Sequence, residues 1–239
     1  MKWVVLVAVL GCNAPSSADN KPSPPAVVQP YPTIRSKLET SRTSLTKGLD
    51  RDRQRTLSRA RQLLVRTLRD ELLPAWNGTP WAMNGITQVP HEGEIACGYF
   101  VSTTLLHAGF AVERSKLGQQ AAGLITRTLV TQEPIWVRSD QPIDAFVDTL
   151  RLGGDGIYLV GLDNHVGFVI VDGEDTWFHH AGPGDQGVRR EPARTASFLS
   201  TSRYREAAKL FDDALLEKWL RGTAIPTVLR RNVATPTER

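Results

Sequence analysis

One cysteine and three histidines are the residues whose types and spacing could carry out chemistry together. Cys97 is one of only two cysteines, and His165, His179 and His180 fall within sixteen residues of one another. A thiol nucleophile needs a base that accepts its proton, and the base needs a third group that fixes its tautomer. Histidine suits both roles because its ordinary pKa lies near neutral pH. These residues predict nucleophilic catalysis by a cysteine.

The residues after Cys97 predict a helix that carries the thiol in its first turn. Small or apolar residues follow Cys97 at offsets of 3, 4, 7, 8 and 11, which trace one face of a helix. Gly109 and Phe110 predict its C-terminal end. A helix N-terminus favours the thiolate, so we expect a lowered pKa for Cys97. The alternative is a buried cysteine with a structural role.

Three strands are predicted at 157–162, 166–171 and 176–181; His165 directly precedes the second, and His179 and His180 lie in the third. Neighbouring side chains in a strand face opposite sides of the sheet, so His179 and His180 cannot share a face. Two registers of the second hairpin are open: one pairs His165 with His180, and the other pairs Gly167 with His180. Both put His180 on the face of His165. We therefore expect His180 to orient the base, and His179 to pack against a helix or face solvent.

Zinc is the alternative chemistry for these residues, with Cys97, His165 and His180 as ligands. The chain has no short Cys/His spacing of the kind that zinc sites use. We therefore expect no metal and no cofactor.

The remaining pattern predicts an α+β fold, in which N-terminal helices, including the one that bears the nucleophile, pack on a small antiparallel sheet. Leucines at helical spacing predict a helix over 57–72 that Pro74 ends. Further helices are predicted at 117–131, 142–152 and 212–221, whereas 189–203 is polar and is expected to be a loop. Arg51, Arg55 and Arg59 share one outer face of the N-terminal helices. We favour a solvated face there over a contact with an anionic surface.

The first twelve residues predict export and anchoring. Met1-Lys2 precedes an apolar run at 3–10, which is typical of a secretory signal and too short to span a bilayer. Cys12 directly after Leu10-Gly11 resembles the bacterial lipobox, whose cysteine becomes lipidated. We expect a proline-rich linker at 13–34.

Length and composition indicate one domain with appendages. The chain has 239 residues, 41% of them hydrophobic, and a net charge of +4. We assign 1–12 to the signal and lipobox, 35–222 to the catalytic domain and 223–239 to a flexible tail. The small positive charge is compatible with anionic partners but does not indicate nucleic acid. We expect a monomer that does not bind nucleic acid.

Four short motifs resemble those of the NlpC-type cell-wall cysteine peptidases of the papain-like clan. The family pattern runs Tyr-x-x-Gly-Gly, Asp-Cys-Ser-Gly, His-Val-Gly-Ile-Tyr and Ile-His-Ala. The corresponding residues here are Trp81-Ala82-Met83-Asn84-Gly85, Ala96-Cys97-Gly98, His165-Val166-Gly167-Phe168 and Phe178-His179-His180-Ala181. The resemblance covers roughly residues 56–182, which is the span of these motifs and the helix before them.

The resemblance implies a papain-like core, with Cys97 as nucleophile, His165 as base and His180 as orienting residue. It also implies a peptide or peptidoglycan substrate. Trp81, Ala96 and Gly98 replace residues that shape the substrate pocket in the family, so the chemistry can carry over without the substrate.

The expected function is an exported, lipid-anchored cysteine hydrolase on the periplasmic side of the envelope. It would cleave an amide bond through a thioester, with the oxyanion held by the backbone N–H of Cys97. His91 lies six residues before Cys97, where papain-like proteases place a glutamine, and Trp81 is a candidate for the substrate groove. The alternative is a non-catalytic envelope lipoprotein that uses the same fold as a binding scaffold.

Overall fold

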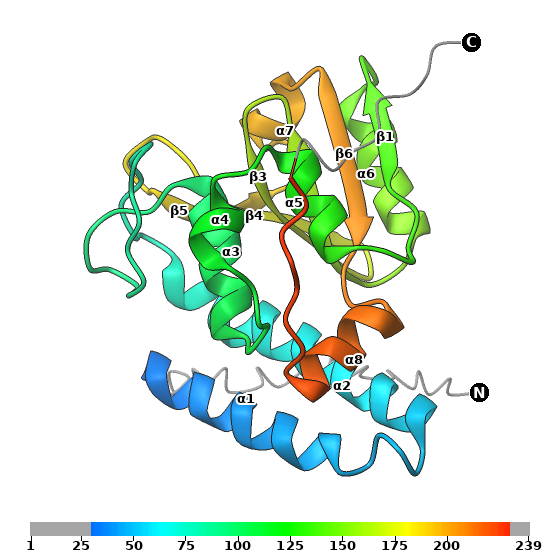
Figure 1. The fold of residues 1–239 in the computed structure, drawn as a ribbon. Helices are drawn as coiled ribbons and strands as arrows, with labels where there is room; N and C mark the ends of the chain where they lie inside the picture. The colour runs from blue at the N-terminus through cyan, green and yellow to red at the C-terminus, as the bar shows by residue number, and fades with distance from the viewer. Residues whose placement is uncertain (1–29, 230–239) are drawn as a thin grey trace, which may run out of the picture.

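Six antiparallel strands form the sheet at the centre of the molecule, in the order β1-β6-β2-β3-β4-β5 (Figure 1). The computed structural model describes residues 30–229. The strands are β1 (Trp136–Ser139), β2 (Gly156–Leu162), β3 (Val166–Asp172), β4 (Asp175–Ala181), β5 (Val188–Pro192) and β6 (Tyr204–Lys209). The predicted α+β class is confirmed, and the three predicted strands are β2, β3 and β4.

Helices cover both faces of this sheet. They are α1 (Tyr31–Thr46), α2 (Arg53–Thr67), α3 (Cys97–His107), α4 (Arg114–Gly118), α5 (Ala122–Leu129), α6 (Ile143–Leu152), α7 (Ser197–Thr201) and α8 (Asp213–Arg221). A π turn at Leu68–Leu72 and a 3₁₀ turn at Pro74–Trp76 extend α2. The proline lacks the N–H that a helix needs, which explains why the predicted helix ends there.

The sheet separates two hydrophobic cores because successive residues of a strand point to opposite faces. In β2, Ile157 and Leu159 pack with α1, α2, α3, α5 and α8, whereas Tyr158 and Val160 pack with α6 and α7. All four side chains are buried. The continuous apolar run of β2 therefore reflects a strand that is covered on both faces.

Two stretches differ from their prediction. The helix predicted over 117–131 is two helices, α4 and α5, with a break at residues 119–121. The stretch 189–203, predicted to be a loop, contains most of β5 and all of α7, and β6 follows it. β5 carries Arg189, Arg190 and Glu191 at an edge of the sheet, so its sequence lacks the apolar alternation by which strands are recognised.

The first helix starts inside the segment predicted to be a linker, at Tyr31 rather than after residue 34. Tyr31 fastens this start to the core. Its hydroxyl oxygen accepts a hydrogen bond from Trp76 Nε1 (2.9 Å) and its O–H donates to His107 Nδ1 (3.0 Å), at the C-terminal end of α3. Burial raises the pKa of Tyr31 to about 12, so the hydroxyl keeps its proton.

Residues 223–229, predicted to belong to a flexible tail, are ordered against the core. Ile225 is buried, its N–H donates to Ala111 O (2.9 Å), and it forms a parallel bridge with Val112. The N–H of Val228 donates to Thr128 Oγ1 of α5 (3.0 Å). Burial of the apolar Ile225 side chain explains why this segment packs against the core.

The predicted signal, the lipobox cysteine Cys12, the linker up to residue 29 and the tail from residue 230 lie outside the described residues. Within residues 30–229 no helix is both long enough and apolar enough to cross a membrane.

Candidate active site

Cys97 is the first residue of α3, as predicted. Ala96 precedes the helix in an extended conformation, and no side chain caps the N-terminus. The first N–H groups of a helix have no partner inside it, so the thiol lies beside backbone donors. Gly109, at φ +91°, and the hydrogen bond from Phe110 N–H to Leu105 O (3.1 Å) end the helix as predicted.

A close backbone contact fixes the first turn of α3. A Cβ placed on Gly98 would lie 2.1 Å from the carbonyl oxygen of Gly118, the last residue of α4. No side chain fits at position 98. This contact requires glycine directly after Cys97.

His165 precedes β3 directly and extends the β2–β3 hairpin by one residue. Its carbonyl accepts a hydrogen bond from Leu162 N–H (2.8 Å), which closes the predicted two-residue turn at Asp163-Asn164. The imidazole is buried and stacks on Phe198 of α7, with ring centroids 4.1 Å apart. The base candidate is thus held rigidly.

The register of the second hairpin places His180 beside His165. Val171 pairs with Thr176 and Phe168 with His179, which is the register that aligns Gly167 with His180, and Asp172 pairs with Asp175 across a two-residue turn. His165 Nε2 and His180 Nδ1 are 2.8 Å apart. A Cβ on Gly167 would lie 2.8 Å from His180 Cβ, so the histidine pair needs a glycine there.

His179 faces the other side of the sheet. Its ring packs against Phe100 of α3, with centroids 5.9 Å apart, and the side chain is fully buried. The prediction that His180 and not His179 approaches His165 is confirmed, as is the packing of His179 against a helix. The catalytic role of His180 stays a prediction.

Glu191 is a member of this cluster that the sequence did not reveal. Its Oε1 lies 2.7 Å from His180 Nε2, and Arg189 Nε lies 3.6 Å from the same oxygen. The carboxylate comes from β5, the polar edge strand. The only hint in the sequence is a glutamate eleven residues after His180.

The chain Glu191–His180–His165 assigns the imidazole protons. An ionised carboxylate only accepts hydrogen bonds, so His180 donates from Nε2 and has a bare Nδ1. His165 then donates from Nε2 to that nitrogen, and its own Nδ1 carries a lone pair. A neutral His165 in this tautomer is able to act as a base.

A pocket of about 530 Å³ joins Cys97 and His165. Its wall consists of the first turn of α3, Gly118, residues 120–123, residues 162–166 and Tyr204. Within the described chain, no hydrogen bond links the Cys97 sulfur to an imidazole. Catalytic hydrogen bonds often tighten only once substrate binds.

Neither residue predicted for the oxyanion hole or the groove lines this pocket. His91 is exposed, has φ +65°, and donates its backbone N–H to Thr79 Oγ1 (3.0 Å). Trp81 packs at the edge of the core, and its buried Nε1 has no hydrogen-bond partner. The antiparallel bridge between Ile86 and Ile95 folds back the loop that carries His91, and neither His91 nor Trp81 belongs to the pocket wall.

The predicted lowering of the Cys97 pKa is wrong for this structure. Burial raises the pKa of the thiol, and hydrogen bonding from the backbone N–H groups of Val166 and Gly98 offsets the rise only in part. Burial also lowers the pKa of His165 and of His180 to about 3, with Arg189 contributing to both. The resting site therefore holds a neutral thiol and neutral imidazoles rather than an ion pair.

No group of three or more His, Cys, Asp or Glu side chains between residues 30 and 229 is arranged to hold a metal ion. Comparison with protein-family models, with curated proteins and with solved structures finds no match to this chain.

Proposed function

We propose that the protein is a cysteine hydrolase with a papain-like core, which cleaves an amide bond through a thioester. The observation that carries the proposal is the hydrogen-bonded chain Glu191–His180–His165, which ends at the pocket that Cys97 lines. Buried histidines in series with a carboxylate are costly to maintain in a fold and serve proton transfer well.

In the proposed reaction the Cys97 thiol transfers its proton to the bare Nδ1 of His165 as the sulfur attacks. The sulfur attacks the substrate carbonyl, and the oxyanion is held by the N–H of Cys97 at the start of α3. The C–N bond breaks, and the leaving amine takes the proton from His165. Water then gives a proton to His165 and its hydroxide attacks the thioester. The acid leaves, and His165 returns its proton to the Cys97 sulfur, which regenerates the thiol.

Because the thiol and imidazole are neutral at rest, proton transfer accompanies attack rather than preceding it. His165 accepts a proton only while substrate is present, and the imidazolium then shares its charge through His180 with Glu191. This carboxylate plays the part that the aspartate plays in a serine-protease triad.

The proposed substrate is a peptide of the cell envelope, with peptidoglycan peptide as the first candidate. The proposal rests here on the four motifs that resemble the NlpC-type peptidases. In the same proposal Cys12 carries a lipid, and the domain works on the periplasmic side of the membrane to which it is anchored.

The test is digestion of isolated peptidoglycan and of envelope peptides, with new amino termini detected by mass spectrometry. Wild type should release fragments, Cys97→Ala should release none, and His180→Ala should be slower by orders of magnitude. All three should show the same circular dichroism. Equal release by wild type and Cys97→Ala would rule out the proposal.

The raised thiol pKa and the missing Cys97–His165 hydrogen bond favour a second candidate, the non-catalytic scaffold. A scaffold would bind peptidoglycan without releasing fragments, and Cys97→Ala would bind as tightly as wild type. Measuring binding and release on the same samples separates the two functions.

A further inference from the structure

We propose that the outer face of the α1–α2 hairpin, for which the sequence alone favours a solvated surface, binds the headgroups of anionic phospholipids and so orients the molecule on a membrane. We call this surface the basic face and define it by Lys47, Arg51, Arg55, Arg59 and Arg66. The proposal concerns a surface remote from Cys97 and does not depend on the reaction there.

The five cations share one side of the hairpin. Arg55, Arg59 and Arg66 are four and seven residues apart on α2, which puts them on one stripe of the helix. Lys47 and Arg51 extend the stripe through the turn that joins α1 to α2. From Arg51 to Arg66 it is about 22 Å long, at the rise of a helix. All five side chains are exposed, and shallow grooves between the two helices run beside them.

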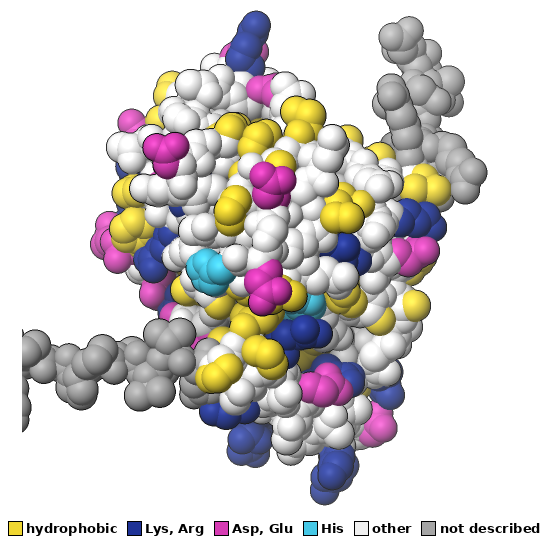
Figure 2. Space-filling model, turned by 90° about the vertical axis from the view of Figure 1, so that its left-hand side faces the viewer, with side chains coloured by type: hydrophobic (Ala, Val, Ile, Leu, Met, Phe, Trp, Pro, Cys, Tyr) yellow, Lys and Arg dark blue, Asp and Glu magenta, His cyan; other side chains and the backbone are white. Residues whose placement is uncertain are grey.

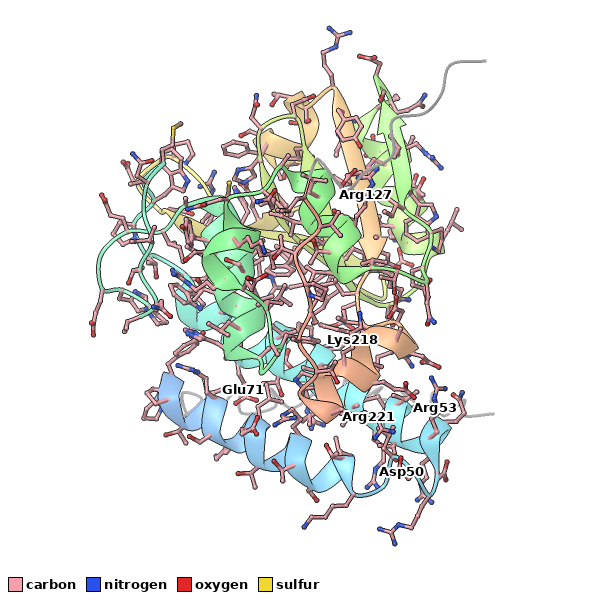
Figure 3. The ribbon with its side chains drawn as sticks, viewed as in Figure 1. Asp50, Arg53, Glu71, Arg127, Lys218 and Arg221 are labelled. Atoms are coloured by element: carbon pink, nitrogen blue, oxygen red, sulfur yellow. The ribbon has the colours of Figure 1, made fainter. Side chains whose placement is uncertain are left out.

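These cations lack the carboxylate partners that other arginines of the same helices have. Where the hairpin meets α8, Arg53 pairs with Glu217 and Arg221 pairs with Asp50; Asp50, Arg53 and Arg221 are labelled in Figure 3. Within residues 30–229, no ion pair involves a member of the basic face. The one acidic residue in the grooves, Asp52, accepts the backbone N–H of Arg55 as the N-cap of α2.

The surface is therefore a local excess of positive charge in a chain whose net charge is only +4. Lys and Arg side chains project from the lower end of the molecule, where α1 and α2 lie (Figures 1 and 2). An excess of this kind attracts an anionic surface and loses its attraction as salt rises.

Two features favour lipid over nucleic acid as the partner. The grooves contain serine, leucine, threonine and glutamine beside the cations, but no aromatic side chain on which a base could stack. The basic face also belongs to the hairpin into which the N-terminal segment leads, and that segment contains the apolar run 3–10. A single lipid or apolar signal anchors weakly, and a basic patch is the usual second signal.

Such binding would turn the pocket away from the membrane. His107, the last residue of α3, contacts Tyr31 at the start of α1, so Cys97 lies at the end of α3 that is distant from the hairpin. A protein seated on its α1–α2 hairpin would present the pocket to the space beyond the membrane.

The experiment is co-sedimentation of the full chain with two kinds of vesicle, phosphatidylcholine alone and phosphatidylcholine with about one third phosphatidylglycerol. Each basic residue near such a surface contributes roughly five-fold in affinity, so Arg55→Gln/Arg59→Gln should bind the anionic vesicles roughly twenty-five-fold more weakly. Its binding to neutral vesicles, which the N-terminal segment alone can support, should not change. High salt should remove the difference between the two vesicles.

Arg138→Glu is the matched control, because it alters the net charge by the same amount on β1, an edge strand of the sheet that is not part of the α1–α2 hairpin. It should bind as wild type does. Equal binding to both vesicles, or equal losses in the control and the double variant, would overturn the proposal. So would salt-sensitive binding of a single-stranded oligonucleotide that needs Arg55 and Arg59 while anionic vesicles bind no better than neutral ones.

Discussion

Glu191 sets the protonation pattern of the two imidazoles that lead to the pocket. Its carboxylate forces the proton of His180 onto Nε2, which in turn leaves Nδ1 of His165 bare. A side chain able both to donate and to accept would remove this constraint. Glutamine at position 191 is such a group, and alanine leaves His180 Nε2 without its partner.

We predict that Glu191→Gln and Glu191→Ala populate both tautomers of His180 and His165, and that any hydrolytic activity falls about a hundred-fold. Nitrogen-15 NMR of the imidazoles measures the tautomers without a substrate. Glu174→Gln, an exposed carboxylate on the β3–β4 turn, is the control and should leave both signals unchanged. Unaltered tautomers in both Glu191 variants would contradict the assignment.

His179 is a buried polar side chain without hydrogen bonds. Neither of its ring nitrogens has a partner, and Phe100 lies against the ring. An unpaired buried polar group costs about 1–3 kcal/mol, so His179→Leu should raise the free energy of unfolding by about 1 kcal/mol. His107→Leu should lower it instead, because it removes the acceptor of the Tyr31 hydroxyl. Urea denaturation at neutral pH measures both, and a His179→Leu protein less stable than wild type would show that the imidazole has a partner.

At the scale of elements, the contact between α3 and α4 positions the candidate nucleophile. Gly98 and Gly123 are both the second residue of their helix, but only Gly98 meets backbone. A Cβ on Gly123 would lie 2.7 Å from the guanidinium of Arg127, which is flexible and can move away, and 3.2 Å from the carboxylate of buried Glu206, which must shift slightly.

We predict that Gly98→Ala lowers the free energy of unfolding by about 2 kcal/mol, because the two helices must separate. Gly123→Ala should be neutral or stabilising by up to about 1 kcal/mol, since alanine favours the helix. The comparison uses urea denaturation of the two variants. Equal effects would mean that α3 and α4 do not depend on this approach.

The sequence predicts those elements whose pattern is local. The spacing after Cys97 defines α3, and the alternation of side chains puts His180 on the face of His165 in either register that was considered. The sequence pattern does not predict β5. Arg189, Arg190 and Glu191 adopt a strand conformation because they pair with β4, and their own residue types do not encode that pairing. Glu191 was missed for the same reason. The low pKa values of the histidines and the raised pKa of Cys97 depend on burial, which no short motif encodes.

At the scale of the whole molecule, four buried histidines make stability sensitive to acid. Burial lowers the pKa of His165, His179 and His180 to about 3 and that of His107 to about 4. Between these values and the ordinary value near 6.5, the unfolded chain binds more protons than the folded chain. The stability that these neutral histidines contribute is therefore fully present above about pH 6.5 and is lost as pH falls toward 3.

We predict that the free energy of unfolding falls by up to about 1.4 kcal/mol per pH unit for each histidine that titrates in this window. Urea titrations at a series of pH values between neutral and about 4 measure the slope. His179→Leu should reduce the slope of the free energy of unfolding against pH by the contribution of one histidine. A free energy that does not change over this range would contradict the low pKa values.

The proposed lipid on Cys12 would attach the whole molecule to a membrane. We predict that Cys12→Ala releases the protein from the membrane fraction or blocks its processing, because the variant cannot receive the lipid. Fractionation and the mass of the mature protein measure this. Membrane association and mature mass that match those of wild type would refute the lipobox prediction.

The hydrogen bonds of Tyr31 also determine how the fold would carry mechanical load. A pull on the chain before residue 30 enters at the first residue of α1, where Tyr31 is fastened to Trp76 and His107. Tension is passed to the C-terminal end of α3, and the eleven residues of that helix, about 16 Å at 1.5 Å per residue, separate this point from Cys97. A force applied through the N-terminal segment would thus act at the C-terminal end of α3 and not at the N-terminal end, where Cys97 lies.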